Sequence, residues 1–574
     1  MAHTGLSLPA LMFSMLVSSS APVPAQQSWI PTETAKLTHG LSGSDHRLGT
    51  SVSITGDTAV AGAPIAGGQG HGAVLVFERD HGGPGAWGEA ATITASDGAL
   101  YDRFGRSVSI SGDTVVVGAP ESDPSGLWDA GSAYVFQRHQ GGPNAWGEVK
   151  KLTASDAAQF DNFGVSVAVE GDTAVVGASL NSAAAGAAYV FQRDRGGAGA
   201  WGQVKKLVAS NARQGHHFGG SVAISGDTIV VGATHALNDG AAYVFERDLG
   251  GQDAWGQYTW LLASDRASQD FFGSSVGISG DTVVVGAFST NHMSPGLIDA
   301  GSAYVYERNA GNPGAWGEVK KLNASDWASY DEFGRGVAIS SDTIVVGSWW
   351  DDHSGRTDAG SAYVFERDRG GPGAWGQAAK FTASDADTDD EFGRRVAISG
   401  GTVIVGAWEE TRWPKVRVGA AYVYEGLSPP QTYCTAGTTG NQCQATMSLS
   451  GTPSLSGEGP VKLVASGVEG NKLGLLFYGI SGRARVLWGQ GSSSFMCVKP
   501  PIQRTPLQDS GGTSGTCTGS LSIDWNDFVG SHRQKPIHQS LAIATRVQAQ
   551  AWFRDPPSPR TTSLSDAIEF QVGP

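Results

Sequence analysis

Aspartates are the residues of this chain whose type and spacing most directly suggest chemistry. The densest group lies in the segment A-D-A-D-T-D-D-E-F-G and comprises Asp385, Asp387, Asp389 and Asp390. Calcium takes six to eight oxygen ligands and carboxylates supply them, so we predict a calcium site here. In the alternative interpretation, aspartates at fixed turn positions cap backbone amides, and Asp389 and Asp390 pair with Arg394 and Arg395.

A second unusual segment combines aromatic rings with carboxylates, in the order Trp349-Trp350-Asp351-Asp352. Exposed aromatic residues beside carboxylates suit a sugar platform or a protein hot spot, so we predict that this segment binds a ligand. Alternatively, Trp349 fills a gap inside the fold at the position that Pro120 takes elsewhere. Four more acidic residues of similar segments are predicted to contribute to the same ligand-binding surface: Asp123, Asp129, Asp299 and Asp358.

Three arginines each follow a Phe-Gly pair directly: Arg106, Arg335 and Arg394. They either clamp an anion or pair with neighbouring carboxylates. The chain contains no H-E-x-x-H, P-loop, G-x-S-x-G or cysteine-rich zinc spacing. We therefore predict no catalytic residue and no cofactor other than the calcium considered above.

These residues lie within a motif that the chain repeats seven times, approximately F-G-x-S-V-x-I-S-G-D-T-V-V-V-G-A followed by A-Y-V-F-E-R-D and G-A-W-G-x-V-K-K-L. The period varies between 54 and 61 residues, whereas 13 residues always separate the first glycine from the later G-A pair. All length variation therefore falls in one loop, between V-V-V-G-A and A-Y-V-F. The anchor glycines are Gly49, Gly105, Gly164, Gly219, Gly273, Gly334 and Gly393.

Each repeat carries four short strand patterns separated by tight turns, and no helix signals. Four-stranded antiparallel units repeated radially form a β-propeller. Six repeats contain all four strands, and the seventh lacks the outermost one. The segment Ala35 to Thr38 matches that missing strand, so we expect it to complete the last blade and close the ring. In such a ring the variable loops and the connectors between blades emerge on one face.

The Phe-Gly and Gly-Ala cores, such as Phe104-Gly105 to Gly118-Ala119, resemble FG-GAP repeats. The resemblance covers about residues 35–425 and implies a seven-bladed propeller like that at the N-terminus of integrin α subunits, here of a bacterial secreted type. Integrin-type repeats often hold calcium between their first two strands. Here that turn is a tight S-G-D-T or a near variant, which offers too few oxygens, so this calcium site is not expected.

The two ends of the chain differ from the repeats. Residues 1–27 resemble a secretory signal with cleavage near Ala25, although no Lys or Arg precedes the apolar run. Residues 28–427 form the propeller, and residues 428–574 are predicted to form a small β-sandwich-like domain. This domain contains all four cysteines, and we favour the sequence-adjacent pairs, Cys434 with Cys443 and Cys497 with Cys517, among three possible connectivities.

The net charge of −15 argues against nucleic acid as a partner, and no later segment is long and apolar enough to span a membrane. We therefore expect an all-β, monomeric protein, secreted or at the cell surface. Its predicted role is non-catalytic recognition or adhesion, binding an extracellular protein or glycan through one acidic face. The alternatives are an envelope component anchored by the C-terminal domain and an extracellular polysaccharide- or ester-acting enzyme.

Overall fold

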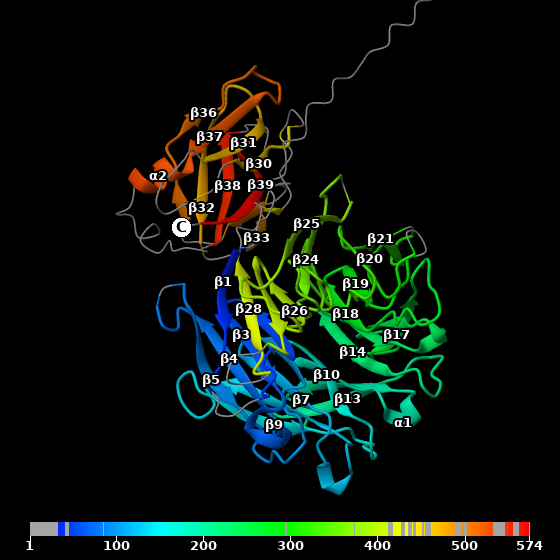
Figure 1. Cartoon of the computed structure of the whole chain (residues 1–574). Coiled ribbons are helices and arrows are strands. Elements are labelled where there is room, and N and C mark those ends of the chain that lie inside the picture. Colours follow the sequence, from blue (N-terminus) through cyan, green and yellow to red (C-terminus); the bar gives the residue numbers. More distant parts are fainter. Residues whose placement is uncertain are drawn as a thin grey trace, which may run out of the picture.

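The computed structural model describes residues 32–40, 45–410 and 417–425 of the repeat region, apart from residues 84, 293–295, 311 and 372. In the C-terminal part it describes residues 431–433, 439, 443–450, 453, 461–480, 483–487, 495–498, 502–531, 546–554 and 562–572. The predicted signal segment and its cleavage position lie outside the described residues. The repeat region forms seven four-stranded antiparallel sheets, which follow one another around a ring (Figure 1).

From the axis outward, each blade contains an innermost, a second, a third and an outer strand. The innermost strands are β2 (Ser51–Thr55), β6 (Ser107–Ser111), β10 (Phe163–Glu170), β14 (Phe218–Ser225), β18 (Ser275–Ser279), β22 (Gly336–Ser340) and β26 (Phe392–Ser399). The second strands are β3 (Thr58–Ala63), β7 (Thr114–Ala119), β11 (Thr173–Ala178), β15 (Thr228–Ala233), β19 (Thr282–Ala287), β23 (Thr343–Ser348) and β27 (Thr402–Ala407). The third strands are β4 (Ala73–Arg79), β8 (Ser132–Arg138), β12 (Ala187–Arg193), β16 (Ala241–Glu246), β20 (Ser302–Arg308), β24 (Ser361–Glu366) and β28 (Ala420–Glu425). The outer strands are β5 (Trp87–Ile93), β9 (Trp146–Leu152), β13 (Trp201–Leu207), β17 (Gly256–Leu261), β21 (Trp316–Leu322), β25 (Gly376–Phe381) and, in blade 7, β1 (Thr32–Leu37).

The ring is closed by the N-terminal strand. β1 pairs antiparallel with β28, and Lys36 lies opposite Tyr422 in the register. Leu37 is buried in a hydrophobic cluster that joins residues of blade 1 to Val423 and Ile404 of blade 7. The innermost strands of all neighbouring blades are in contact, including β26 with β2. The predicted seven-bladed propeller and its closing strand are therefore confirmed.

The hydrophobic core lies between adjacent blades. The second strand of each blade is buried on both faces, and in β7 Val115, Val116 and Val117 are fully buried. Val115 and Val117 pack against Val60 and Val74 of blade 1. Full burial of a valine stabilises a fold by roughly 1.5–3 kcal/mol, so this repeated contact holds the ring together. The continuous V-V-V pattern follows from this two-sided burial.

The face of the ring opposite the variable loops carries the hairpins between the first and second strands of each blade. There the repeated arginine of the E-R-D motif contacts its own blade, the preceding blade and the tryptophan of the outer strand. Arg308 contacts Asp281 in its own blade at 2.8 Å and Glu246 in the preceding blade at 2.5 Å. Its guanidinium also lies over the ring of Trp316, 4.8 Å from the centroid. The same arrangement recurs with Arg138 and Trp146 in blade 2. The repeated tryptophan is thus a packing residue, as its recurrence suggests.

In their described residues, the variable loops contain only single helical turns. The one labelled α1 (Asn181–Ala184) lies in blade 3, and Ser182 and Ala183 in it have left-handed backbone angles, with φ of 54° and 58°. Positive φ is unfavourable for residues with a side chain, which explains why the sequence shows no helix signal there.

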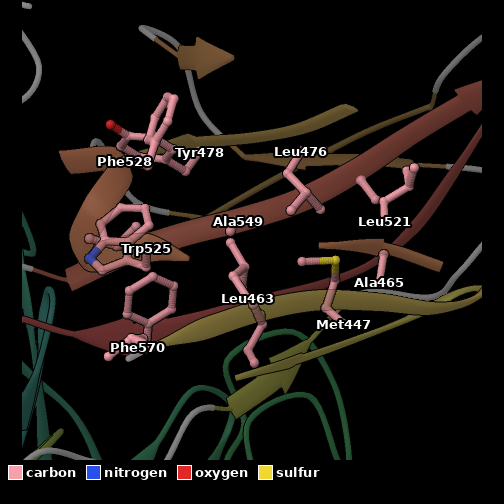
Figure 2. Packing of buried hydrophobic residues seen from close by; sticks show 14 of the residues in the cluster. Met447, Leu463, Ala465, Leu476, Tyr478, Leu521, Trp525, Phe528, Ala549 and Phe570 are labelled. Atoms are coloured by element: carbon pink, nitrogen blue, oxygen red, sulfur yellow. The ribbon is translucent and has the colours of Figure 1, made fainter. Parts of the chain in front are cut away.

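The C-terminal part consists of two main sheets that share one hydrophobic core (Figure 2). One sheet contains β29 (Gln431–Tyr433), β32 (Leu473–Gly479), β35 (Ile502–Arg504), β36 (Gln508–Asp509), β38 (Arg546–Arg554) and β39 (Thr562–Gln571). The other contains β30 (Thr446–Ser450), β31 (Lys462–Val468) and β37 (Gly519–Asp524), while β33 (Arg483–Leu487) and β34 (Phe495–Val498) pair separately. Leu463 and Met447 from the smaller sheet pack with Leu476 of the larger one and Trp525 of the helix α2 (Trp525–Ser531). Two packed sheets match the expected sandwich, but β30, β37 and α2 were not predicted.

The disulfide that the structure describes joins Cys443 to Cys517, with their Cα atoms 5.3 Å apart. The predicted pairs Cys434–Cys443 and Cys497–Cys517 are therefore wrong. Proximity in sequence misled the prediction because the segments around the two cysteines, 74 residues apart, meet only once the sheets have formed. The side chains of Cys434 and Cys497 lie outside the described residues.

Candidate functional site: the loop face of the propeller

The variable loops and the connectors between blades lie on one face of the ring, which we call the loop face. Connector residues of one blade junction donate backbone hydrogen bonds to the variable loop of the preceding blade. Asn162 N lies 3.0 Å from Asp129 O, and Glu391 N lies 3.1 Å from Asp358 O. A glycine permits this approach, since a Cβ on Gly131, at φ 83°, would lie 2.1 Å from Phe163 O. The loop face is thus a rigid, cross-linked surface.

Many aspartates of this face are structural. Asp156 of the connector accepts hydrogen bonds from Tyr189 Oη at 2.8 Å and Lys206 Nζ at 2.6 Å, both in the next blade. Burial favours a higher pKa for Asp156, but the bonds from Lys206 and Tyr189 outweigh it and lower the pKa. We call this contact the Asp–Tyr–Lys clasp. It recurs with Asp97, Tyr134 and Lys151; with Asp265, Tyr304 and Lys321; with Asp326, Tyr363 and Lys380; and with Asp385, Tyr422 and Lys36.

A second aspartate of each of these connectors caps the turn that follows the clasp. Asp161 Oδ2 accepts the backbone N–H of Ala158 at 2.9 Å, and Asp331 accepts that of Ala328 at 2.6 Å. Asp331 and Asp390 are buried, and burial raises the pKa of each to about 7 despite the backbone hydrogen bond. The capping alternative therefore accounts for these residues.

The residues predicted to hold calcium are directed to different partners. Asp385 contacts Lys36 and Tyr422, while Asp390 Oδ2 accepts from Asp387 N at 2.7 Å. The backbone of Asp389 takes a positive φ of 64° and donates to Thr357 O. Arg394 pairs with Glu391 at 3.4 Å. Within the described residues, no three His, Cys, Asp or Glu side chains converge in a way that would suit a metal ion.

The tryptophan segment of blade 6 points inward. Trp349 is only 7% exposed, stacks on Trp350 at 4.7 Å between ring centroids, and donates from Nε1 to Glu332 at 2.6 Å. The predicted alternative, that Trp349 fills a gap in the fold, is thus the one the structure favours. Asp351 is also buried, where it accepts from Ser361 at 2.6 Å and pairs with Lys380 at 2.8 Å.

The remaining predicted ligand residues form a shared loop design. In blade 6, the exposed Asp352 accepts the backbone N–H of Asp358 at 2.9 Å through Oδ1. Asp123 and Asp129 do the same in blade 2, at 2.8 Å. In blade 5, Asn291 takes the first position and accepts from Asp299 at 2.8 Å. These acidic residues shape three similar loops and leave carboxylates at the surface.

Exposed hydrophobic residues of the loop face were not predicted. Trp128 is 64% exposed at the tip of the blade 2 loop, and Phe160, 51% exposed, donates its backbone N–H to Trp128 O. Tyr330 and Ile298 form the equivalent pair between blades 5 and 6 and are 54% and 51% exposed. Tyr101, in the connector between blades 1 and 2, is the third exposed aromatic residue of the connectors, after Phe160 and Tyr330.

The aromatic residues of the connectors occupy a strained position. Tyr101, Phe160 and Tyr330 have φ values of 71°, 66° and 73°, and each lies three residues before the Phe of a Phe-Gly pair. In the connector between blades 3 and 4 this position is Gly215. A bulky residue at positive φ costs on the order of 1–3 kcal/mol relative to an unstrained one. Aligning the connectors on their Phe-Gly pairs would have revealed these aromatic residues.

The fold and this face define the class: a seven-bladed β-propeller whose structural contacts repeat and whose loops vary. The repeats match the family described as FG-GAP repeat, over residues 31–77, 87–136, 146–191, 201–245, 255–306, 316–365 and 375–424. The chain therefore belongs to the FG-GAP repeat family. No curated protein matches it.

Among solved structures, the chain is similar to the crystal structure of Sqt1 from Chaetomium thermophilum. The sequence identity is 14%, the match covers 69% of this chain and 91% of that chain, and the TM-score is 0.38. A likeness at this level carries no information on function. In the part of the chain that the structure describes, no helix is long and apolar enough to cross a membrane.

Proposed function

We propose that this protein is an exported, non-catalytic recognition module that binds another protein through the loop face, at the sector formed by Tyr101, Trp128 and Phe160. The observation that carries the proposal is the retention of exposed aromatic residues at a backbone position where glycine would relieve strain. Strain of this kind, kept at the surface, is a feature of functional sites. Aromatic residues of this type also dominate the binding energy of protein interfaces.

The surroundings of this sector favour a protein over a glycan. Leu100, next to Tyr101, is 50% exposed, and Ile298 beside Tyr330 is similarly exposed. Aliphatic side chains contribute to protein interfaces through burial, whereas stacking on sugar rings requires aromatic planes. Asp123 and the neighbouring Asp129 supply a polar, negatively charged rim.

Two features support export and the absence of catalysis. The Cys443–Cys517 disulfide is typical of proteins in oxidising compartments, and the first 27 residues resemble a secretory signal. The buried carboxylates of the loop face described above are engaged by tyrosine, lysine, serine, tryptophan or backbone amides. Such groups support the structure and are not directed toward a common reacting position.

The test is a binding screen of the full-length chain against arrays of extracellular proteins and of glycans. The variant Phe160→Gly/Trp128→Ser removes the sector, and Leu249→Ser/Val319→Ser is the control, because Leu249 and Val319 are exposed but lie outside the loop face. We expect a protein hit that the sector variant weakens at least about tenfold and the control leaves unchanged. Binding to glycans alone, or a protein hit that the sector variant retains, would refute the proposal.

A further inference from the structure

Four arginines lie near one another at the loop-face ends of the innermost strands, and we call them the arginine cluster: Arg106, Arg335, Arg394 and Arg395. Arg106, Arg335 and Arg394 occupy the same repeat position in blades 2, 6 and 7, directly after the anchor glycine. The other four blades carry small residues there: Thr50, Val165, Gly220 and Ser274. The cluster is thus specific to one part of the ring and is not a product of the repeat.

Arg395 replaces a serine that joins neighbouring blades. In five blades this serine donates to the carbonyl of the next anchor glycine, as Ser107 does to Gly164 O at 2.8 Å. Arg395 instead donates to the carbonyl oxygens of Arg394 and Arg335, at 3.1 and 3.4 Å. Blade 6 carries Gly336 at this position, and a Cβ there would lie 2.9 Å from Arg394 O. Blades 6 and 7 therefore lack the serine contact between blades, and these two blades carry three of the four arginines.

Aromatic rings hold the guanidinium planes of the cluster. Arg335 lies over Phe288 and Trp349, at 4.3 and 5.1 Å from the ring centroids. Arg394 lies over Trp349 and Trp408, at 4.5 and 3.9 Å. Stacking fixes an arginine without using its N–H edge, so its hydrogen-bond donors stay available for an anion.

The carboxylates around the cluster do not neutralise it. Glu332 and Glu391 accept hydrogen bonds from the indoles of Trp349 and Trp408, respectively. Within the described residues, the ion pair between Arg394 and Glu391, at 3.4 Å, is the only one that any arginine of the cluster forms. Glu121, which also attracts Arg106, is paired with Arg103 at 2.8 Å. Among the described residues, the four guanidinium groups of the cluster thus stand against the carboxylates of Glu332 and Glu391.

Burial makes this excess positive charge costly. Arg394 is only 8% exposed, and its Nε, like that of Arg335, is buried and has no hydrogen-bond partner among the described residues. Burial, followed by repulsion from Arg335 and Arg106, lowers the pKa of Arg394 to about 10. The pKa of Arg395 is also lowered well below its usual value, by burial and by repulsion from Arg394 and Arg335. Buried donors that repel one another and lack partners are the signature of a site for an opposite charge.

We propose that the arginine cluster is a binding site for a doubly charged tetrahedral oxyanion, a phosphate or sulfate group. Such a group has the two negative charges that balance the excess, and its oxygens accept the paired N–H donors of guanidinium groups. It comes either as the free ion or as a phosphate monoester on a larger molecule. This site is separate from the aromatic sector of the proposed function and does not depend on it.

The experiment uses the full-length chain in buffers of equal ionic strength containing chloride, acetate, inorganic phosphate, inorganic sulfate or phosphoserine. Calorimetric titration gives the affinity, and thermal unfolding gives Tm. We expect saturable binding of phosphate and sulfate, and a Tm that rises with either ion but not with chloride or acetate. Binding of phosphoserine as well identifies a site open to esters, and its failure to bind identifies a site for the free ion; both outcomes support the proposal.

The matched variants exploit the repeat. Arg106→Ser/Arg335→Ser introduces the residue that blade 5 carries as Ser274, so the ring tolerates it. Lys150→Ser/Lys320→Ser removes the same charge from exposed positions of the outer strands. We expect the arginine variant to bind phosphate at least about tenfold more weakly and the lysine variant to bind it as the wild type does.

Unfolding without added anion separates a ligand site from a structural one. If the arginine cluster is an anion-binding site, the anion-free arginine variant should be at least as stable as the wild type, because removing two arginines relieves the repulsion between guanidinium groups. A lower Tm of the anion-free variant would assign the cluster a structural role and overturn the proposal. So would the absence of saturable phosphate or sulfate binding to the wild type, or equal binding of acetate.

Discussion

At the rim of the loop face the same Asp–Tyr–Lys clasp recurs at five blade junctions. At the axis, by contrast, only blades 6 and 7 combine an arginine after the anchor glycine with a tryptophan after the Gly-Ala or Gly-Ser pair. The rim contacts join neighbouring blades and satisfy each carboxylate with two donors. At the axis, the Nε atoms of Arg335 and Arg394 find no acceptor in the part of the chain that the structure describes. Repetition therefore marks the residues that build the propeller, and departure from the repeat marks the residues available for binding.

The junctions without the complete clasp strengthen this comparison. Between blades 3 and 4, Asn211 replaces the aspartate and accepts from Tyr243 at 2.7 Å, while Trp260 replaces the lysine and contacts the Tyr243 ring. In blade 1, Leu75 and Thr92 take the positions of the tyrosine and the lysine. The members of the clasp change together because a buried lysine or carboxylate without its partner is costly.

Removing residues 26–40 should have the largest effect on the rim, because it deletes β1 and with it Lys36 of the clasp with Asp385. The lost strand exposes the edge of β28 and the apolar surface that Leu37 covers, and Leu37 alone contributes roughly 1.5–3 kcal/mol. We expect a lower Tm and aggregation, measured by scanning calorimetry and light scattering. A variant with an unchanged unfolding profile would mean that the ring closes without this strand.

The substitution Asp156→Ala should destabilise the propeller by about 1–3 kcal/mol, because it leaves the Tyr189 hydroxyl buried and Lys206 with one partner fewer. Denaturant unfolding measures this change. The control is Asn211→Ala in blade 4, where a neutral hydrogen bond is lost and no lysine is involved, so we expect a smaller loss. Equal losses for the two variants would argue against the lysine as a contributor to the clasp.

A smaller and pH-dependent effect is expected for Asp390→Asn. Burial raises the pKa of Asp390 from 3.8 to about 7 in the folded protein, so the stability that Asp390 contributes is present below pH 3.8 and is lost as the pH rises toward 7. Asparagine does not titrate and still accepts the Asp387 amide. The Tm of the variant relative to the wild type should therefore increase between pH 5 and pH 8.

Asp385→Asn is the control for this pH dependence. Burial favours a higher pKa for Asp385, but the bonds from Lys36 and Tyr422 lower it below 3.8. Its contribution is present above pH 3.8 and is lost only in more acidic solution, so its variant should show a constant difference from the wild type between pH 5 and pH 8. A constant difference for Asp390→Asn as well would contradict the raised pKa.

The rim and the ring could be predicted from the sequence because seven copies show which spacings are fixed. The missing outer strand of blade 7 and its match at Ala35 to Thr38 follow from that spacing alone. The axial site could be predicted only in part. Arg106, Arg335 and Arg394 share a repeat position, and Trp349 and Trp408 share another, but Arg395 occurs once. The neighbours of these residues are known only from the folded ring.

The other errors have the same origin. The repeat position of Trp349 holds aromatic residues in blades 5 and 7, Phe288 and Trp408, and smaller residues elsewhere. The sequence therefore could not decide between an exposed and a buried ring, and the structure buries Trp349 against Trp350 and the arginines. The disulfide between Cys443 and Cys517 depends on which C-terminal segments lie side by side. Because these segments are not repeated, their spacing in the sequence does not show which cysteines are neighbours in space. Where each element occurs once, sequence spacing carries little information about contacts across the fold.

The smallest effect is expected from adding or removing calcium. This test concerns residues 385–390, which contain both the clasp aspartate of blade 7 and the predicted calcium ligands. A calcium site would need the oxygens of Asp385, Asp387 and Asp390 to converge, but Asp385 is held by Lys36 and Tyr422 and Asp390 by a backbone amide. Moving these carboxylates onto an ion would break a clasp that supports the closure of the ring. We therefore expect Tm to change by less than about 1 °C on adding calcium or a chelator, which corresponds to only a fraction of a kcal/mol in the free energy of unfolding. A rise of several degrees with calcium, absent in Asp387→Asn, would show that the segment rearranges around the ion and that the clasp of blade 7 is not a fixed part of the rim.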